Sequence, residues 1–193
     1  MARPRSFDEE AALEQAVRLF RERGYEATSL ADLEAQLGVG RQSLYNTFGS
    51  KQALFLKALD RYRRESAAAV LERLNVPGAG LDEIRAFFHQ AVESLTSVDP
   101  RCGCLVTNTI VERGPQDAEA LLRCNAARDV LERAFRRALA QAKARGELTA
   151  AMDTEALATL LVVHTYGLNV LAKTGATAAE LHASVEALLA GLR

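Results

Sequence analysis

Apolar residues recur in this sequence with the 3.6-residue period of an α-helix, and glycine or proline interrupts the pattern at intervals. Leu13, Ala16 and Phe20, for example, would share one face of a helix. Residues that favour helices dominate the composition, whereas strand-forming residues do not cluster. The sequence therefore predicts an all-α fold with about nine helices, over residues 7–23, 30–37, 41–46, 51–74, 81–97, 102–113, 116–145, 154–173 and 178–192.

Capping signals mark the ends of several of these helices. The segments Ser6–Glu9 and Thr177–Glu180 have the pattern of a capping box, in which a hydroxyl and a carboxylate satisfy free N–H groups of the first turn. Ser29 and Ser50 are placed to cap the second and fourth helices. Gly24 is expected to end the first.

Two short helices joined by a glycine-containing turn follow the first helix, which is the arrangement of a helix-turn-helix. The turn, Leu37–Gly40, is tight enough to set the next helix at a steep angle. That helix carries side chains of the kinds that contact DNA: Arg41 suits a guanine or a phosphate, Gln42 suits adenine and the Tyr45 hydroxyl suits a phosphate. The alternative is a three-helix packing unit in which Tyr45 and Phe48 are core aromatics.

The charge pattern fits local rather than general binding to nucleic acid. The formal net charge of the chain is -1, which argues against a coat protein for nucleic acids. Residues 36–59, however, include no acidic side chain but contain Arg41, Lys51 and Lys57. Arg3 and Arg5 precede the first helix, so a basic face is available if the fold brings these groups together.

Two patterns in register give the chain a resemblance to a known family. Gly24–Thr28 leads into the second helix, and Leu44–Leu54 spans the third helix and the start of the fourth with the pattern Leu-Tyr-x-x-Phe-x-x-Lys-x-x-Leu. Both resemble the N-terminal domain of TetR-family transcriptional regulators. The resemblance implies a helix-turn-helix DNA-binding domain at residues 1–50 and a ligand-binding and dimerisation domain at residues 51–193.

The resemblance also implies a set of DNA contacts. Many family members have Ser or Thr where Gly40 stands, and use it to cap the third helix and contact phosphate; glycine is only a slightly weaker cap, so the fold is kept while that contact is in doubt. The predicted DNA-binding residues are Thr28, Ser29, Gly40, Arg41, Gln42, Ser43, Tyr45, Asn46, Thr47 and Lys51.

The last two helices have wide apolar faces that need a covering partner. The resemblance implies that they pair with their copies in a homodimer, and a two-fold protein suits a palindromic operator. The alternative is that both faces are buried within one subunit. The predicted interface residues are Leu160, His164, Gly167, Leu168, Leu171, Leu181, Val185 and Leu188.

A small-molecule effector needs apolar walls with a few polar groups. In this family the effector site lies among the helices that correspond to the fourth to eighth. Each residue predicted to bind an effector could instead have a structural role in the core or at the interface. The predicted ligand-binding residues are Phe88, Cys102, Cys104, Thr107, Asn108, Val111, His164 and Tyr166.

The segment from Cys102 to Pro115 is distinctive, because it resembles the start of helix six in a TetR subgroup with Gly-Cys-Leu followed by Asn, Glu and Pro. A cysteine at a helix N-terminus has a lowered pKa, and Arg101 would lower it further, so Cys102 or Cys104 is a candidate sensor of electrophiles. The alternative is that Cys104 is a small buried residue. Metal binding by the three cysteines lacks a zinc-like spacing, and no cofactor is expected.

Neither a signal peptide nor a membrane span is expected, so the sequence favours a cytoplasmic protein. The predicted function is a dimeric repressor that binds double-stranded DNA and is released when a small molecule shifts its conformational population, with helix 51–74 as the lever. A transcriptional activator is one alternative. A helical cysteine-dependent enzyme is another, but no motif places His89 or His164 beside a cysteine.

Overall fold

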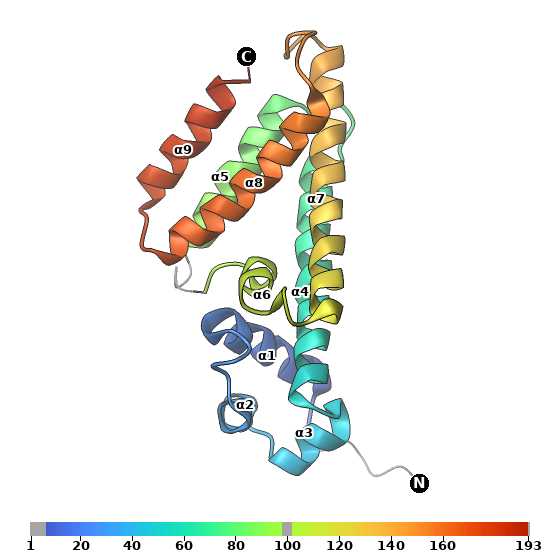
Figure 1. Cartoon of the computed structure of the whole chain (residues 1–193), viewed down its shortest axis with the longest axis vertical. Helices are drawn as coiled ribbons and strands as arrows, with labels where there is room; N and C mark the ends of the chain where they lie inside the picture. The colour runs from blue at the N-terminus through green and yellow to red at the C-terminus, as the bar shows by residue number, and fades with distance from the viewer. Residues whose placement is uncertain (1–6, 98–101, 193) are drawn as a thin grey trace. The chain divides into compact units, whose positions relative to one another are not determined.

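The computed structural model describes residues 7–97 and 102–192, and these residues form nine α-helices and no strand (Figure 1). The predicted all-α class is therefore confirmed. The helices are α1 (Glu9–Arg23), α2 (Leu30–Leu37), α3 (Arg41–Phe48), α4 (Lys51–Leu74), α5 (Leu81–Ser97), α6 (Leu105–Arg113), α7 (Ala118–Ala144), α8 (Thr154–Lys173) and α9 (Ala178–Ala190).

Most helix starts follow the predicted caps. Thr177 begins α9 with a complete capping box, as does Ser29 for α2, and the Ser50 hydroxyl accepts a hydrogen bond from the N–H of Ala53 at 3.0 Å. The start of α1 was predicted wrongly. Its N-cap is Asp8, whose carboxylate accepts from two N–H groups of the first turn and so does the work assigned to Ser6. Ser6, Arg3, Arg5 and Arg101 lie outside the described residues.

The start of α6 also differs from the prediction. Gly103 adopts a positive φ of 57°, and Cys104 is the N-cap in an extended conformation, so the helix begins at Leu105. Cys102 therefore precedes the helix and does not belong to its first turn.

The chain divides into two compact units, formed by residues 1–64 with 104–124 and by residues 65–103 with 125–193. The first unit contains α1, α2, α3, α6, the start of α4 and the start of α7. Its core is built around Phe20 and Phe55, whose ring centroids lie 5.1 Å apart, and Tyr25 packs edge-on against Phe55 at 4.9 Å. Leu33 and Leu54 complete the buried centre.

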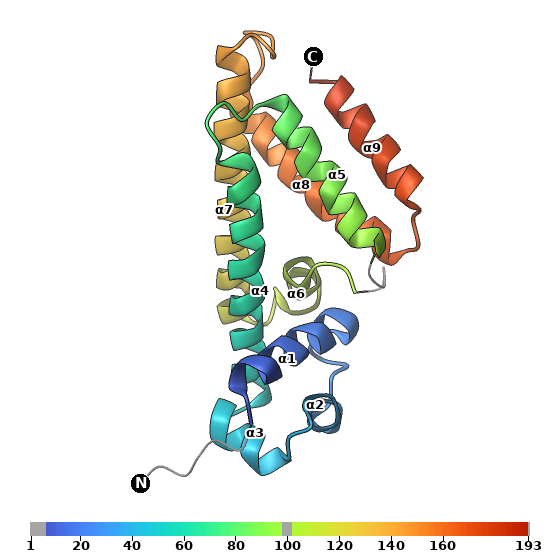
Figure 2. The same cartoon turned by 180° about the vertical axis from the view of Figure 1, so that it is seen from behind.

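In the second unit, α5, α8 and α9 lie side by side, as both views show (Figures 1 and 2). Phe88 is fully buried, and its ring stacks on that of Phe135 with 5.7 Å between centroids. Ile84, Leu161 and Leu181 are also completely buried in this core. These buried residues of the three helices therefore cover one another within a single chain.

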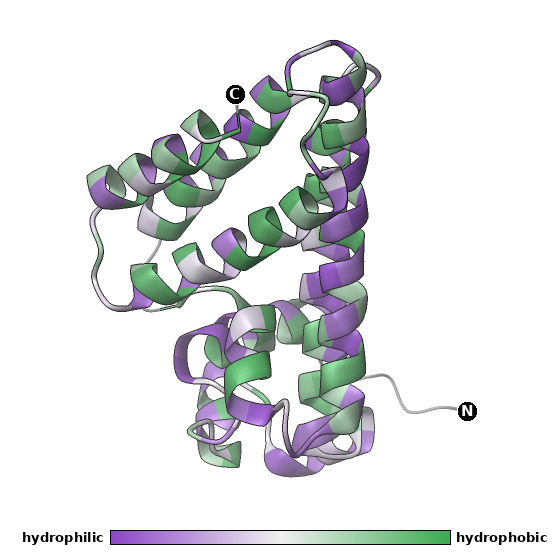
Figure 3. Cartoon of the chain, turned by 45° about the horizontal axis from the view of Figure 1, so that its top comes forward, coloured by the Kyte–Doolittle hydropathy of each residue, from purple (hydrophilic) through white to green (hydrophobic). Residues whose placement is uncertain are grey.

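Apolar residues recur along the whole of α8, as the hydropathy colours show (Figure 3). By length and composition alone this helix could cross a membrane, with a window of mean hydropathy 1.3. In this structure 28% of the window is buried, and α8 packs Leu161 and Leu168 into the core shared with α5 and α9.

Candidate nucleic-acid interface

The turn between α2 and α3 has the geometry of a helix-turn-helix. Gly38 ends α2 in the left-handed conformation, with a φ of 64° that favours glycine, and Gly40 is the N-cap of α3. Val39, Leu44 and Phe48 are buried, which fixes α3 against the rest of the unit. The predicted helix-turn-helix is confirmed.

The other face of α3 is polar and open to solvent. Arg41, Gln42 and Asn46 are exposed, and Tyr45 retains 41% of its accessible surface. Tyr45 is therefore not a core aromatic, unlike Phe48. The predicted residues Ser43 and Thr47 are half-buried on the same short helix. The face thus presents amide, hydroxyl and guanidinium groups of the kinds that contact bases and phosphates.

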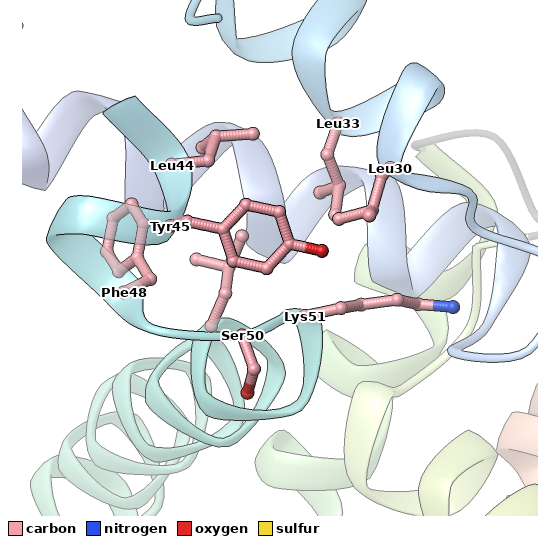
Figure 4. A pocket seen from close by; sticks show the side chains of 8 residues that line it. Leu30, Leu33, Leu44, Tyr45, Phe48, Ser50 and Lys51 are labelled. Atoms are coloured by element: carbon pink, nitrogen blue, oxygen red, sulfur yellow. The ribbon is translucent and has the colours of Figure 1, made fainter. Parts of the chain in front are cut away.

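A shallow apolar recess lies beside this face, where α2, α3 and the start of α4 meet (Figure 4). The ring of Tyr45 forms part of its wall, with Leu30 and Leu33 from α2. Ser50 and Lys51 complete its lining from the N-terminus of α4. A helix N-terminus with a lysine nearby is a favourable place for a phosphate group.

The remaining DNA-binding candidates differ in their surroundings. Thr28 is completely buried, and its hydroxyl donates to the carbonyl of Gly24 at 2.6 Å, so it stabilises the α1–α2 turn and has no exposed side chain for DNA. Ser29 is exposed, but its hydroxyl is engaged in the capping box of α2. The ammonium group of Lys51 lies 4.2 Å from the centre of the Tyr25 ring, a cation–π contact that DNA would have to compete with.

Three side chains of α6 bind the end of α1 and the turn after it; we call Asn108, Glu112 and Arg113 the α6 clamp. The two carboxylate oxygens of Glu112 accept the backbone N–H groups of Tyr25 and Glu26, each at 2.8 Å. Asn108 donates its amide to the carbonyl of Arg21 at 3.2 Å. Asn108 thus satisfies a carbonyl near the end of α1, where helix carbonyls lack partners, and Glu112 satisfies two N–H groups of the turn that follows.

Arg113 completes the clamp. Its guanidinium lies 4.1 Å from the centre of the Tyr25 ring and forms ion pairs with Glu26 and Asp117. Burial raises the pKa of Asp117, but hydrogen bonds from the Ala120 N–H and from Arg113 outweigh it and leave the pKa below its usual value. The α6 clamp is therefore a charged network built on the turn that leads into the helix-turn-helix.

The predicted effector-binding residues are divided between the two units. Phe88, Cys102, His164 and Tyr166 belong to the second unit, and Cys104, Thr107, Asn108 and Val111 to the first. Within the first, Asn108 is used by the α6 clamp and Val111 is 73% exposed. Thr107 is buried, and no described residue bonds its hydroxyl. Within the second, Phe88 contacts the His164 ring edge-on at 5.4 Å.

The cysteines have three different environments. Cys102 and Cys104 are half-buried, and Cys104 is the N-cap of α6. Cys124 is fully buried, and burial raises its thiol pKa to about 12, so this residue stays protonated and unreactive. The described residues form no cluster of three or more potential metal ligands.

His164 gives the second unit a pH-dependent stability. Burial lowers the pKa of its imidazole. The unfolded chain, in which the pKa is about 6.5, therefore binds more protons than the folded chain, so stability is present above that pH and is lost as the pH falls. Urea unfolding of the wild type at pH 7.5 and 5.5 should show this loss, and His164→Gln should show less of it. An equal pH dependence in both proteins would contradict the assignment.

The predicted dimer-interface residues form two groups. Leu168, Leu181 and Val185 are buried within one chain. For these three residues the structure therefore agrees with the alternative prediction, burial within a single subunit. Leu160, Gly167 and Leu171 are exposed on α8, whereas His164 and Leu188 are half-buried. Sequence reasoning missed two exposed residues of the same helix, Val163 and Val170.

Comparison with known proteins agrees with this architecture. Residues 12–58 match the family model described as bacterial regulatory proteins, tetR family. Residues 80–188 match the model described as tetracyclin repressor-like, C-terminal domain.

Full-length relatives extend the match. The chain is 38% identical to the HTH-type transcriptional regulator YezE of Bacillus subtilis over 193 residues, 100% of both chains. It is 33% identical to the HTH-type transcriptional repressor ComR of Escherichia coli, over 93% of this chain and 86% of ComR. A cysteine-substituted form of the TetR-family regulator CifR, solved with a 26-base-pair double-stranded operator, superposes with a TM-score of 0.88 and 32% identity over 100% of both chains. The chain therefore belongs to the TetR family, as a DNA-binding transcriptional regulator.

Proposed function

We propose that this protein is a cytoplasmic repressor that binds a palindromic operator as a homodimer and is released by a small-molecule effector, without catalytic activity. The observation that carries the proposal is the exposed polar face of α3, mounted on buried Leu44 and Phe48. In this arrangement α3 enters the major groove and its side chains contact base edges. ComR is named a repressor and CifR was solved on its operator, which supports the same role here.

The exposed stripe of α8 supplies the dimer contact. Leu160, Val163, Gly167 and Leu171 follow one another at spacings of three or four residues and so share one face of the helix. Gly167 has no neighbour within 4 Å of a Cβ built on it, so a second backbone has room to approach there. A two-fold copy would cover this apolar face and present two α3 helices to the two half-sites.

The effector acts by binding the DNA-competent and DNA-released conformations unequally. Helix α4 is the proposed lever, because it begins in the first unit and ends in the second. The functional boundary between residues 50 and 51 is part of this proposal. A thiol-reactive effector remains the alternative to a non-covalent one, with Cys102 or Cys104 as the target.

The direct test is a mobility-shift assay of purified protein on the DNA that flanks its own gene, at several salt concentrations. We expect salt-sensitive binding to a palindrome, by a particle with the mass of two chains. Release by an electrophile from the wild type, but not from a Cys102→Ser, Cys104→Ser variant, would support the thiol alternative. Failure to bind any flanking or selected duplex would exclude the repressor function.

Lys51→Ala tests the phosphate site at the start of α4. The side chain offers a point charge and no base-reading geometry, so its loss should weaken binding to operator and unrelated DNA by similar factors. Because one phosphate contact is lost, the magnitude of the slope of log affinity against log salt should fall by roughly 0.9. Titrations at four salt concentrations measure both quantities. A loss confined to one sequence would contradict the phosphate assignment.

A further inference from the structure

Arg41 of α3, a predicted DNA-binding residue, pairs with a carboxylate of α2. The Nε atom of Arg41 donates to Oε1 of Glu34 at 2.6 Å, across the turn of the helix-turn-helix. The Glu34 side chain is 29% exposed and that of Arg41 is 58% exposed. Glu34 is therefore the less exposed partner of the pair.

This contact selects which donors of Arg41 remain available. A guanidinium has five N–H donors in one plane, and Glu34 engages the one on Nε. In the described part of the chain, no residue hydrogen-bonds the two terminal amino groups of Arg41. Those two groups form the edge that pairs with O6 and N7 of guanine in the major groove.

The carboxylate also changes what Arg41 is attracted to. An unpaired arginine is drawn to any phosphate, which strengthens binding to all sequences equally. Glu34 offsets that charge and repels phosphates, so the pair disfavours non-specific contacts. Holding the side chain in one orientation also reduces the conformational entropy lost when a base is bound. Both effects raise discrimination between sequences more than they raise affinity.

We propose that Glu34 is a positioning residue for base recognition, which orients Arg41 so that its terminal amino groups read the O6 and N7 atoms of a guanine. The inference rests on the proposed function, because it requires α3 to lie in the major groove. It adds one specific partner to that function: a G·C pair at a fixed position in each half-site.

The test compares wild type with Glu34→Gln on three kinds of duplex: the operator, operators with each base pair of the half-site replaced in turn, and unrelated DNA. Wild type should prefer G·C at one position, and Glu34→Gln should lose about fivefold or more of that preference. Affinity for unrelated DNA should rise at low salt, because a negative charge has been removed. A purely structural role would not produce opposite changes in these two quantities.

Three further variants serve as controls. Glu14→Gln changes the net charge equally in another exposed ion pair, with Arg18 of α1, and should leave the preference unchanged. Arg41→Lys keeps the charge but lacks the planar fork, so it should lose the preference and retain the salt dependence. In an Arg41→Ala background, Glu34→Gln should have no further effect on the preference.

The outcomes separate this inference from the function on which it rests. If wild type discriminates between duplexes but Glu34→Gln discriminates equally well, with a melting temperature like that of wild type, the positioning role is overturned and the repressor function stands. A guanine preference that survives in Arg41→Ala or Arg41→Lys also overturns it. If wild type binds no sequence specifically, both proposals fail.

Discussion

Replacing Phe88 with alanine is expected to lower the free energy of unfolding of the second unit by about 3–5 kcal/mol. The side chain is completely buried, and its ring contacts Phe87, Phe135 and His164. Removing it would leave a cavity in the centre of the packing shared by α5 and α8. Denaturant unfolding followed by helical circular dichroism measures the effect.

Phe87→Ala is the matched control, because the neighbouring ring is only partly buried and its loss should cost less. The pair of variants also decides between two roles for Phe88. If Phe88 is a core residue, Phe88→Ala should lower the free energy of unfolding more than Phe87→Ala does. If Phe88→Ala instead changed stability by less than about 1 kcal/mol and abolished the response to an effector, Phe88 would line the effector site and our assignment to the core would be wrong.

Gly24→Ala is expected to destabilise the first unit by at least about 2 kcal/mol, because the backbone there has φ 83° and ψ -179°, a region that is essentially restricted to glycine. An added Cβ would also lie 2.8 Å from a carboxylate oxygen of Glu112, within the α6 clamp. Both effects act on the turn that leads into α2, so operator affinity should fall as well. Thermal unfolding and the mobility-shift assay report the two losses.

A double mutant separates the two causes. Glu112→Ala removes the clash but leaves the backbone strain, so Gly24→Ala with Glu112→Ala should be less destabilised than the sum of the single variants. Gly191→Ala is the control, since its φ of -71° suits any residue and the nearest heavy atom to an added Cβ, the carbonyl oxygen of Leu188, lies 3.4 Å away. Strict additivity would show that the clamp carboxylate does not constrain Gly24.

Helix positions were predictable where local chemistry decides them. Helices α4, α5 and α8 begin and end as expected, because serine, aspartate, glycine and proline punctuate the chain there. The start of α1 was misplaced by two residues since Ser6 and Asp8 are both good N-caps, and the pattern alone does not choose between them. The exposed face of α3 also followed from spacing, because Leu44 and Phe48 fix its orientation.

Contacts between distant segments were much less predictable. Glu112 entered the prediction only as part of a motif, and Asn108 was predicted to bind an effector. The groups that these two side chains bind are backbone atoms 86 or 87 residues away, which residue type alone does not predict. An apolar stripe also predicts that a helix face is covered, but it does not show whether the same chain or a partner subunit covers it. This is why Leu181 and Val185 were expected at a dimer interface, whereas α9 buries them within its own chain.

The α6 clamp has a consequence for building chimeric regulators. Residues 104–124 belong to the same compact unit as residues 1–64, although 39 residues of the other unit (65–103) separate them in the chain. A recombinant that exchanges DNA-reading heads at residue 50 would transplant the α1–α2 turn without the carboxylate that holds its N–H groups. Grafts that carry α6 along with the head, or that restore Asn108, Glu112 and Arg113 in the recipient, should keep the new head folded and active.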